Sequence, residues 1–171
     1  MEVVLYELRF DCGKALGFLP ILILGLAFFF ADKWMGRAHA SSSIKTKEIS
    51  PRIFKVITRC IGVLCAVVFS VFFALHVSEY HTYKNMLKAD AVTTVQGCVE
   101  DFSPLPRYEK GKESFEINGV YFAYNDADRT SGYKKTADFG GVITHNGQHL
   151  IIKYVTNEDG ENTILYIAEI E

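Results

Sequence analysis

The residues best equipped for chemistry lie in the second half of the chain, and two histidines are the first to test. His145 and His149 are close enough in sequence to share a metal ion. The Asn146-Gly147 pair between them predicts a tight hairpin, in which His145 pairs with Gln148 and His149 pairs with Thr144. This register points the two imidazoles to opposite faces, because successive side chains of a strand alternate. The sequence therefore predicts no shared histidine site.

A second candidate is the run of oxygen-bearing side chains at Asp126, Asp128 and Thr130, which is similar to the start of a calcium-binding loop. Such a loop needs a glycine at its sixth position and a bidentate glutamate at its twelfth. Here Gly132 comes one place late, and Ala137 stands where the glutamate belongs. We expect no metal site, with a weak cation site as the alternative.

Cys98 is the remaining candidate nucleophile. A reactive thiol needs a neighbouring base or cation, and the sequence assigns none to it. The chain contains no G-x-S-x-G and no C-x-x-C, and Gly140-Gly141 precedes a predicted strand rather than the helix that a phosphate loop requires. Acidic pairs such as Glu100-Asp101 are typical of solvated turns and edges. We expect no enzymatic activity, no catalytic residue and no cofactor.

The elements that must position these residues include membrane-spanning segments. Residues 60–77 form a run of 18 residues without Asp, Glu, Lys or Arg. As a helix this run is about 27 Å long, close to the ~30 Å hydrocarbon core of a bilayer. Residues 15–31 form a second uncharged run, flanked by Lys14 and Trp34 where interfacial anchors belong. We expect two membrane helices.

The start of the chain has two possible interpretations. Residues 1–14 are expected to lead into the first helix along the membrane interface, or to form its first turns. A cleaved signal peptide is the alternative for the first apolar run, because Ala38-His39-Ala40 resembles a cleavage site. The leading segment is not basic and the apolar run exceeds the usual length of about 7–15 residues, so we expect it to be retained. Pro20 predicts a kink in this helix.

Charge orients these helices. The connector of residues 32–59 has seven basic and two acidic residues, a net charge of +5, whereas residues 91–171 have seven basic and thirteen acidic ones, a net charge of −6. Basic connectors stay in the cytoplasm. We therefore expect a multi-pass protein of the plasma membrane, the inner membrane in a bacterium, with both termini outside. The acidic domain argues against a nucleic-acid partner, because phosphates attract positive charge.

Small residues recur every four positions in the second apolar run, at Gly62, Ala66, Ser70 and Ala74. This spacing places them on one face of a helix, where another backbone can approach closely. We expect the two helices to pack as a hairpin along this face, or to pair between chains in a homo-oligomer.

After residue 91 the hydrophobic period changes to two, with many β-branched and aromatic residues, which predicts strands. Asn118-Gly119 predicts a type I′ hairpin that pairs Phe115 with Phe122 and Ile117 with Val120. Turns at Asn146-Gly147 and Asp159-Gly160 join three more strands, at 142–145, 150–155 and 163–168, and an opening strand covers 94–102. The expected fold class is an α+β membrane protein, with a two-span region at 1–90 and an antiparallel β-domain at 91–171, either an OB or SH3-like barrel or an open meander.

Two connections are longer than a turn and are the expected contact surfaces. Residues 103–108 are extended by two prolines, and residues 125–140 form a loop of a length that is usually functional or disordered. The candidate partner contacts on these segments are Tyr108, Arg129, Tyr133 and Lys134.

Three sequence patterns resemble a β-domain of uncharacterised bacterial envelope proteins, which is often joined to a membrane helix. They are GCVEDFSPLP, ESFEINGVYFAY and GYKKTADFGG, followed by a closing pair of strands. The resemblance covers about residues 95–170 and depends on glycine, proline and aromatic positions. It implies a small β-domain in the cell envelope and no catalytic residue.

These patterns predict a membrane-anchored β-domain that recognises a protein or ligand outside the cytoplasm, as an envelope adaptor, an immunity-type protein or a subunit of a complex. The alternative is an accessory or regulatory subunit of a transporter or channel, in which the helices carry the function. The expected partners are the lipid bilayer and another envelope or membrane protein.

Overall fold

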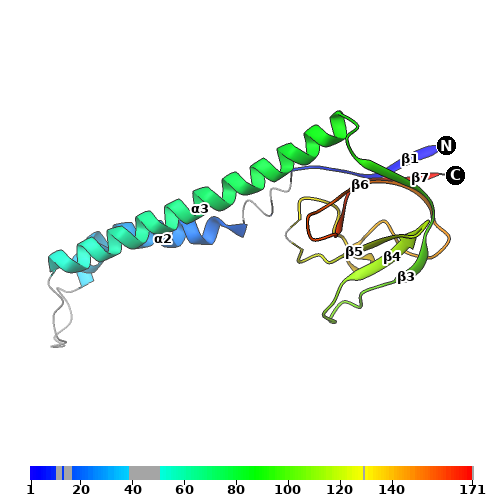
Figure 1. Ribbon diagram of the computed structural model, residues 1–171. Coiled ribbons are helices and arrows are strands. Elements are labelled where there is room, and N and C mark those ends of the chain that lie inside the picture. The colour runs from blue at the N-terminus through cyan, green and yellow to red at the C-terminus, as the bar shows by residue number, and fades with distance from the viewer. Residues whose placement is uncertain (11–12, 14–16, 39–50, 129, 171) are drawn as a thin grey trace. The chain divides into compact units, whose positions relative to one another are not determined.

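The structure is a computed structural model that describes residues 1–10, 13, 17–38, 51–128 and 130–170. The chain divides into two units. Met1–Phe10 and Glu79–Glu171 form the β-domain, and Asp11–Ser78 form a helical segment inserted between them (Figure 1). The expected division was a single boundary at residue 90. In the structure the β-domain also includes residues 1–10, and its second part begins at Glu79.

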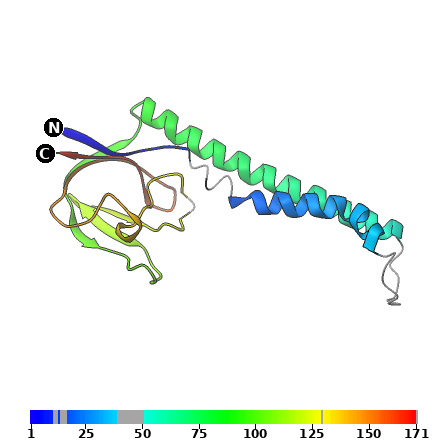
Figure 2. The same cartoon turned by 180° about the vertical axis from the view of Figure 1, so that it is seen from behind.

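The largest departure from the sequence-based expectation is a strand at the N-terminus. Strand β1 (Glu2–Glu7) pairs antiparallel with the last strand, β7 (Asn162–Ile170). The two strands lie side by side in both views (Figures 1 and 2). The Leu8 amide extends the contact by donating to the Leu165 carbonyl at 3.0 Å. The prediction that residues 1–14 run along the membrane interface or form helical turns is therefore wrong for β1.

Strand β1 completes a sheet of four strands in the order β1-β7-β6-β2, and a second sheet has the order β3-β4-β5. The predicted opening strand is present as β2 and β3, which are separated by the buried Val99 and belong to different sheets. The predicted turn at Asp159-Gly160 joins β6 to β7. The other strands of the two sheets are β2 (Thr93–Cys98), β3 (Glu100–Ser103), β4 (Glu113–Ile117), β5 (Val120–Tyr124) and β6 (His149–Thr156).

The β4–β5 hairpin forms as predicted. Phe115 pairs with Phe122 and Ile117 pairs with Val120. The turn residues Asn118-Gly119 have φ angles of 48° and 77°, as a type I′ turn requires. Phe115 and Phe122 are fully buried, with ring centroids 5.1 Å apart. The core around them also includes Ile143, Leu150, Ile152, Ile164 and Ile167.

The strand predicted at residues 142–145 does not form. The Gln148 side chain donates to the Val142 carbonyl at 2.9 Å and also accepts from a backbone amide of this segment at 3.3 Å. These side-chain bonds satisfy backbone groups that a hairpin would have paired. His149 pairs instead with Cys98 of β2. The register predicted for the two histidines is therefore wrong.

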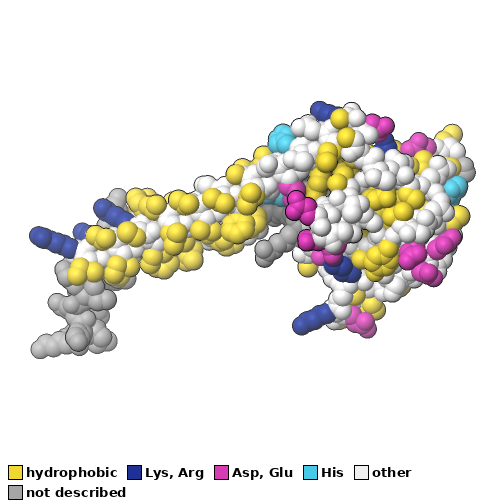
Figure 3. All heavy atoms as spheres, viewed as in Figure 1, with side chains coloured by type: hydrophobic (Ala, Val, Ile, Leu, Met, Phe, Trp, Pro, Cys, Tyr) yellow, Lys and Arg dark blue, Asp and Glu magenta, His cyan; other side chains and the backbone are white. Residues whose placement is uncertain are grey.

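Two helices make up the helical segment: α2 (Leu19–Ala38) and α3 (Pro51–Lys88), the last turns of which enter the β-domain. α3 has 38 residues, so it is about 57 Å long at ~1.5 Å per residue. Its length and composition allow it to cross a membrane. The apolar part of α2, Leu19–Phe30, is shorter. Hydrophobic side chains cover much of the visible helical surface (Figure 3).

The position of Pro20 gives no reason for the predicted kink in the helix. Pro20 lies in the first turn of α2, where a proline nitrogen removes no intrahelical hydrogen bond. Pro51 occupies the equivalent place as the first residue of α3. Both prolines therefore mark helix starts.

The two helices touch at a pair of glycines. A Cβ atom added to Gly25 would lie 2.8 Å from the Cβ of Cys65 and 3.2 Å from the carbonyl oxygen of Gly62. The rings of Phe18 and Phe72 stack at 5.3 Å between the same two segments. A backbone approach this close needs glycine, as the small-residue pattern of membrane helices predicts.

Of the predicted packing residues, Gly62 and Ala66 lie at this contact, whereas Ser70 and Ala74 are exposed. Four residues turn an α-helix by about 40° more than a full circle, so a four-residue row drifts away from a straight neighbour. On α3, the residues that contact the first helical segment are instead Gly62, Cys65 and Phe72. The role of Ser70 and Ala74 in pairing between chains stays a prediction.

The pairing of β1 with β7 predicts that the β-domain folds without its helical segment. Glu2 lies opposite Ile170, so residues 79–171 followed by a short turn and residues 1–10 form a permuted chain. We expect this domain to unfold cooperatively in urea. Residues 79–171 alone should be less stable by roughly 2–4 kcal/mol, because removing β1 uncovers β7. Equal stability of the two chains would show that β1 does not belong to the domain.

Candidate functional site

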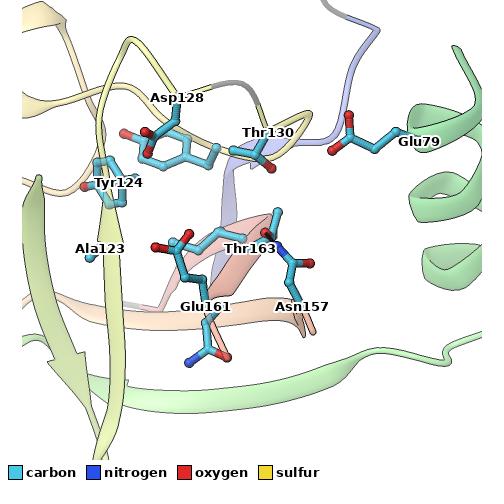
Figure 4. A pocket seen from close by; sticks show the side chains of 11 residues that line it. Glu79, Ala123, Tyr124, Asp128, Thr130, Asn157, Glu161 and Thr163 are labelled. Carbon is cyan, nitrogen blue, oxygen red and sulfur yellow. Dashed lines mark hydrogen bonds between the residues drawn. The ribbon is translucent and has the colours of Figure 1, made fainter. Parts of the chain in front are cut away.

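A cavity of about 280 Å³ opens in the β-domain. Its lining comes from β5, the loop that follows β5, the start of β7 and the part of α3 that belongs to this domain (Figure 4). The lining is mainly polar, and includes Glu79, Asp128, Thr130, Asn157, Glu161 and Thr163. The predicted contact loop of residues 125–140 therefore supplies part of the cavity.

This loop packs directly on β7. The Tyr133 amide donates to the Ile164 carbonyl at 2.8 Å. At Gly132 an added Cβ atom would lie 2.6 Å from that carbonyl oxygen and 2.5 Å from the Cγ2 atom of Thr163. Any larger residue would push the loop away from the strand, so Gly132 fixes this side of the cavity.

A fully buried carboxylate holds the other end of the same loop. Glu113 accepts hydrogen bonds from the Tyr124 hydroxyl at 2.7 Å, the Ala137 amide at 3.0 Å and the Leu105 amide at 3.4 Å. A buried charge is stable only with such donors around it. The donors come from β5, from the 3-10 turn η1 (Ala137–Phe139) and from the connection after β3. One side chain thus fixes three segments.

Two buried tyrosines form the inner side of the cavity. Burial raises the pKa of Tyr124, and the nearby Glu113 carboxylate raises it further. Burial also raises the pKa of Tyr133 to about 12, opposed by the hydrogen bond that the Val142 amide donates to its hydroxyl at 2.7 Å. Their rings meet edge to face at 5.2 Å. Both side chains are therefore neutral at physiological pH.

Three carboxylates line the cavity, and Lys112 outside the lining offsets the charge of one of them, Glu161. The other two, Glu79 and Asp128, give the lining a negative charge. Glu79 accepts from the Ser131 hydroxyl at 2.8 Å and from its amide at 3.3 Å. Glu161 accepts from the Lys112 ammonium at 2.6 Å, and Asp128 is the third carboxylate. Among the described residues that line the cavity, none is basic. This charge favours cationic or hydrogen-bond-donating groups and disfavours anions.

The predicted contact residues do not gather at one place. Tyr133 lines the cavity with only 4% of its surface exposed. Tyr108 is 94% exposed on the connection between β3 and β4, and Lys134 is half-buried outside the lining. Arg129 lies outside the described residues.

The residues that resemble a calcium loop take part in the internal hydrogen bonds of the loop. Asp126 accepts from the Thr136 hydroxyl, and Asp128 accepts from the Asn125 amide at 2.8 Å. Within the described parts of the chain, no group of three or more His, Cys, Asp or Glu side chains is placed to hold a metal ion.

The sequence-based reasoning did not single out several residues of the site. Glu79 and Glu161 reach the cavity from segments that are far apart in sequence, and Glu113 is one glutamate among several in an alternating strand. The length of the loop after β5 is the sequence signal that indicates this region, and its role in contacts stays a prediction.

Comparisons of the chain with protein-family models, with curated proteins and with solved structures found no match. The resemblance of residues 95–170 to an envelope β-domain therefore stays a prediction. The function has to be argued from geometry.

Replacing Glu113 tests its role in fixing the loop. Glu113→Leu leaves the Tyr124 hydroxyl and the Ala137 amide without their acceptor, so we expect the permuted domain to lose roughly 2–4 kcal/mol of stability in urea unfolding. Glu113→Gln keeps one acceptor oxygen and should lose less. Glu116→Gln, on the same strand, is the control. An equal effect of Glu113→Leu and Glu116→Gln would contradict the assignment.

The raised pKa of Tyr133 predicts a loss of stability in alkali. Above pH 10 the unfolded tyrosine releases its proton, whereas the folded one keeps it until about pH 12. The folded state then binds more protons, so stability falls by about 1.4 kcal/mol per pH unit for this group. Urea unfolding between pH 10 and 12 should show a shallower fall for Tyr133→Phe than for the unmodified domain. The exposed Tyr108→Phe is the control, and equal slopes for all three would refute the prediction.

Proposed function

We propose that the chain is a plasma-membrane protein with two spans, which presents its β-domain outside the cytoplasm to recognise a protein or ligand without catalysis. The pairing of β1 with β7 is the observation that carries this proposal. It joins the residues before the helical segment to the domain that follows it. The helical segment therefore starts and ends at one folded domain.

The ends of the inserted segment also meet within that domain. The rings of Phe10 and Tyr80 lie edge to face, with centroids 5.3 Å apart. A chain that leaves a folded domain and returns to it crosses a membrane an even number of times. If α3 is one crossing, the uncharged run of residues 15–31, which contains the whole apolar part of α2, is the other. Cleavage after Ala40 would remove β1, which argues for retention of this run.

The distribution of charge supports the orientation. The connector between the apolar runs has a net charge of +5, and the basic side of a hairpin stays in the cytoplasm. The β-domain then lies on the opposite side, together with both termini. Apolar side chains exposed along α3, including Leu64, Val67 and Leu75, suit contact with lipid.

The cavity is the proposed ligand site of this domain. It combines three carboxylates with neutral hydrogen-bonding groups, and its sides are fixed by the contacts of Gly132, Glu113 and Glu79. Such a site suits a polar ligand, or a side chain of a partner protein, that carries a positive charge. The exposed Tyr108 is proposed as a separate contact with the partner.

Purification of the intact protein from membranes in detergent tests this proposal. We expect Glu161→Ala, and Thr130→Trp, which fills the cavity, to reduce the amount of the bound partner by about tenfold, the effect of losing about 1.4 kcal/mol of binding. Glu158→Ala changes an exposed acid of the same turn outside the lining and should have no effect. Equal recovery of the partner with all three variants would refute recognition through the cavity.

The alternative is an accessory subunit of a transporter or channel, which the exposure of Ser70 and Ala74 on α3 favours. Small residues on an exposed helix face allow a partner helix to approach. Under this alternative, Ser70→Leu and Ala74→Leu remove the partner while the cavity variants retain it.

A further inference from the structure

We propose that the cavity is coupled to both points at which the β-domain joins its helical segment, so that a molecule in the cavity changes how firmly β1 is held. The inference rests on the proposed ligand site and adds a route by which binding there would reach the helices.

The first connection passes through Tyr133. Its ring lines the cavity and meets the ring of Tyr6 edge to face, with centroids 5.0 Å apart. Tyr6 belongs to β1, which leads directly to the chain that enters α2. Both segments are also held on β7, because the Tyr133 amide donates to the Ile164 carbonyl and the Leu8 amide donates to the Leu165 carbonyl. A movement of Tyr133 therefore acts on the strand that precedes α2.

The second connection passes through Glu79. This residue is part of α3, lines the cavity, and accepts both hydrogen bonds from Ser131. Ser131 is buried, with 6% of its surface exposed, and stands between Thr130, which lines the cavity, and Gly132, which packs closely on β7. The same loop thus contacts β1 at Tyr133 and α3 at Ser131.

Strand β1 is the element that can change state. It is an edge strand, paired on one side with β7, and its register shifts between Val4 and Tyr6. Val3 and Val4 are 43% and 54% exposed, whereas Leu5 and Tyr6 pack against the core, so the apolar contacts that hold the strand are concentrated around Tyr6, the residue that meets Tyr133. An edge strand held in this way opens at lower free energy than the core of a domain. The two states are β1 paired and β1 released.

The direction of the effect follows from the contacts. A ligand that packs on Tyr133 in its present position also holds the ring against Tyr6, so it favours the paired state. Coupling between two sites is reciprocal, so fixing β1 must in turn stabilise the loop that lines the cavity.

Hydrogen exchange of the full chain in lipid nanodiscs tests the coupling without a ligand. Tyr133→Leu removes the ring from Tyr6, and we expect the amides of residues 2–8 to exchange at least tenfold faster. Tyr154→Leu removes another buried tyrosine, which packs on Phe122 of the other sheet, and reports the effect of general destabilisation. Equal acceleration of residues 2–8 in both variants, or none in Tyr133→Leu, would overturn the proposal.

A second experiment tests the effect of β1 on the cavity and leaves the cavity residues unchanged. Val4 lies opposite Ala168, so Val4→Cys with Ala168→Cys places a disulfide between β1 and β7 in a chain whose native cysteines are replaced by serine. We expect oxidation to slow exchange at residues 130–136 at least threefold compared with the reduced form. Unchanged exchange there would overturn the coupling. Neither arm depends on a partner or on membrane orientation, so its failure would leave the proposed recognition function standing.

Discussion

Five residue pairs between β1 and β7 join the first residues of the chain to the last ones. This ladder closes a loop of more than 150 residues, and it makes the helical segment an insertion within one domain rather than an anchor at one end. Strand β1 is synthesised first but has no partner until β7 is complete, so the domain can be finished only after the helices have been made. The division of the chain into one domain with an inserted helical segment depends on this pairing, and the proposed two-span topology depends on it in turn.

Polar contacts then determine the shape of the site. Glu113 fixes the later part of the loop after β5 through hydrogen bonds, and Gly132 fixes its middle through the absence of a side chain. Glu79 fixes the middle of the same loop through Ser131. The described residues of this loop, 125–128 and 130–140, therefore have a defined conformation, although they contain no strand and only one short 3-10 turn. A ligand bound in such a cavity, as proposed, would have to order little of its lining.

The sequence predicted features that depend on neighbouring residues and missed those that depend on distant ones. The Asn118-Gly119 hairpin was predicted with its register, because a two-residue turn fixes which side chains face each other. Strand β1 was missed because its partner lies at the other end of the chain, and because its apolar residues precede an apolar helix. The Asn146-Gly147 hairpin failed because the Gln148 side chain takes over the backbone bonds of the segment before the turn. For the cavity, the predicted contact loop supplies Tyr133 to the lining, whereas Glu79 and Glu161 come together only in the folded domain.

Labelling of single cysteines in intact cells tests the central claim most directly, in a chain whose native cysteines are replaced by serine. Glu2→Cys reports on β1, Glu158→Cys on the turn between β6 and β7, and Ser42→Cys on the basic connector. The proposed two-span topology, with β1 paired to β7, predicts that a membrane-impermeant maleimide labels the first two from outside, and labels the third only after the membrane is permeabilised. Labelling of Glu2→Cys and Glu158→Cys from opposite sides of the membrane would contradict the account.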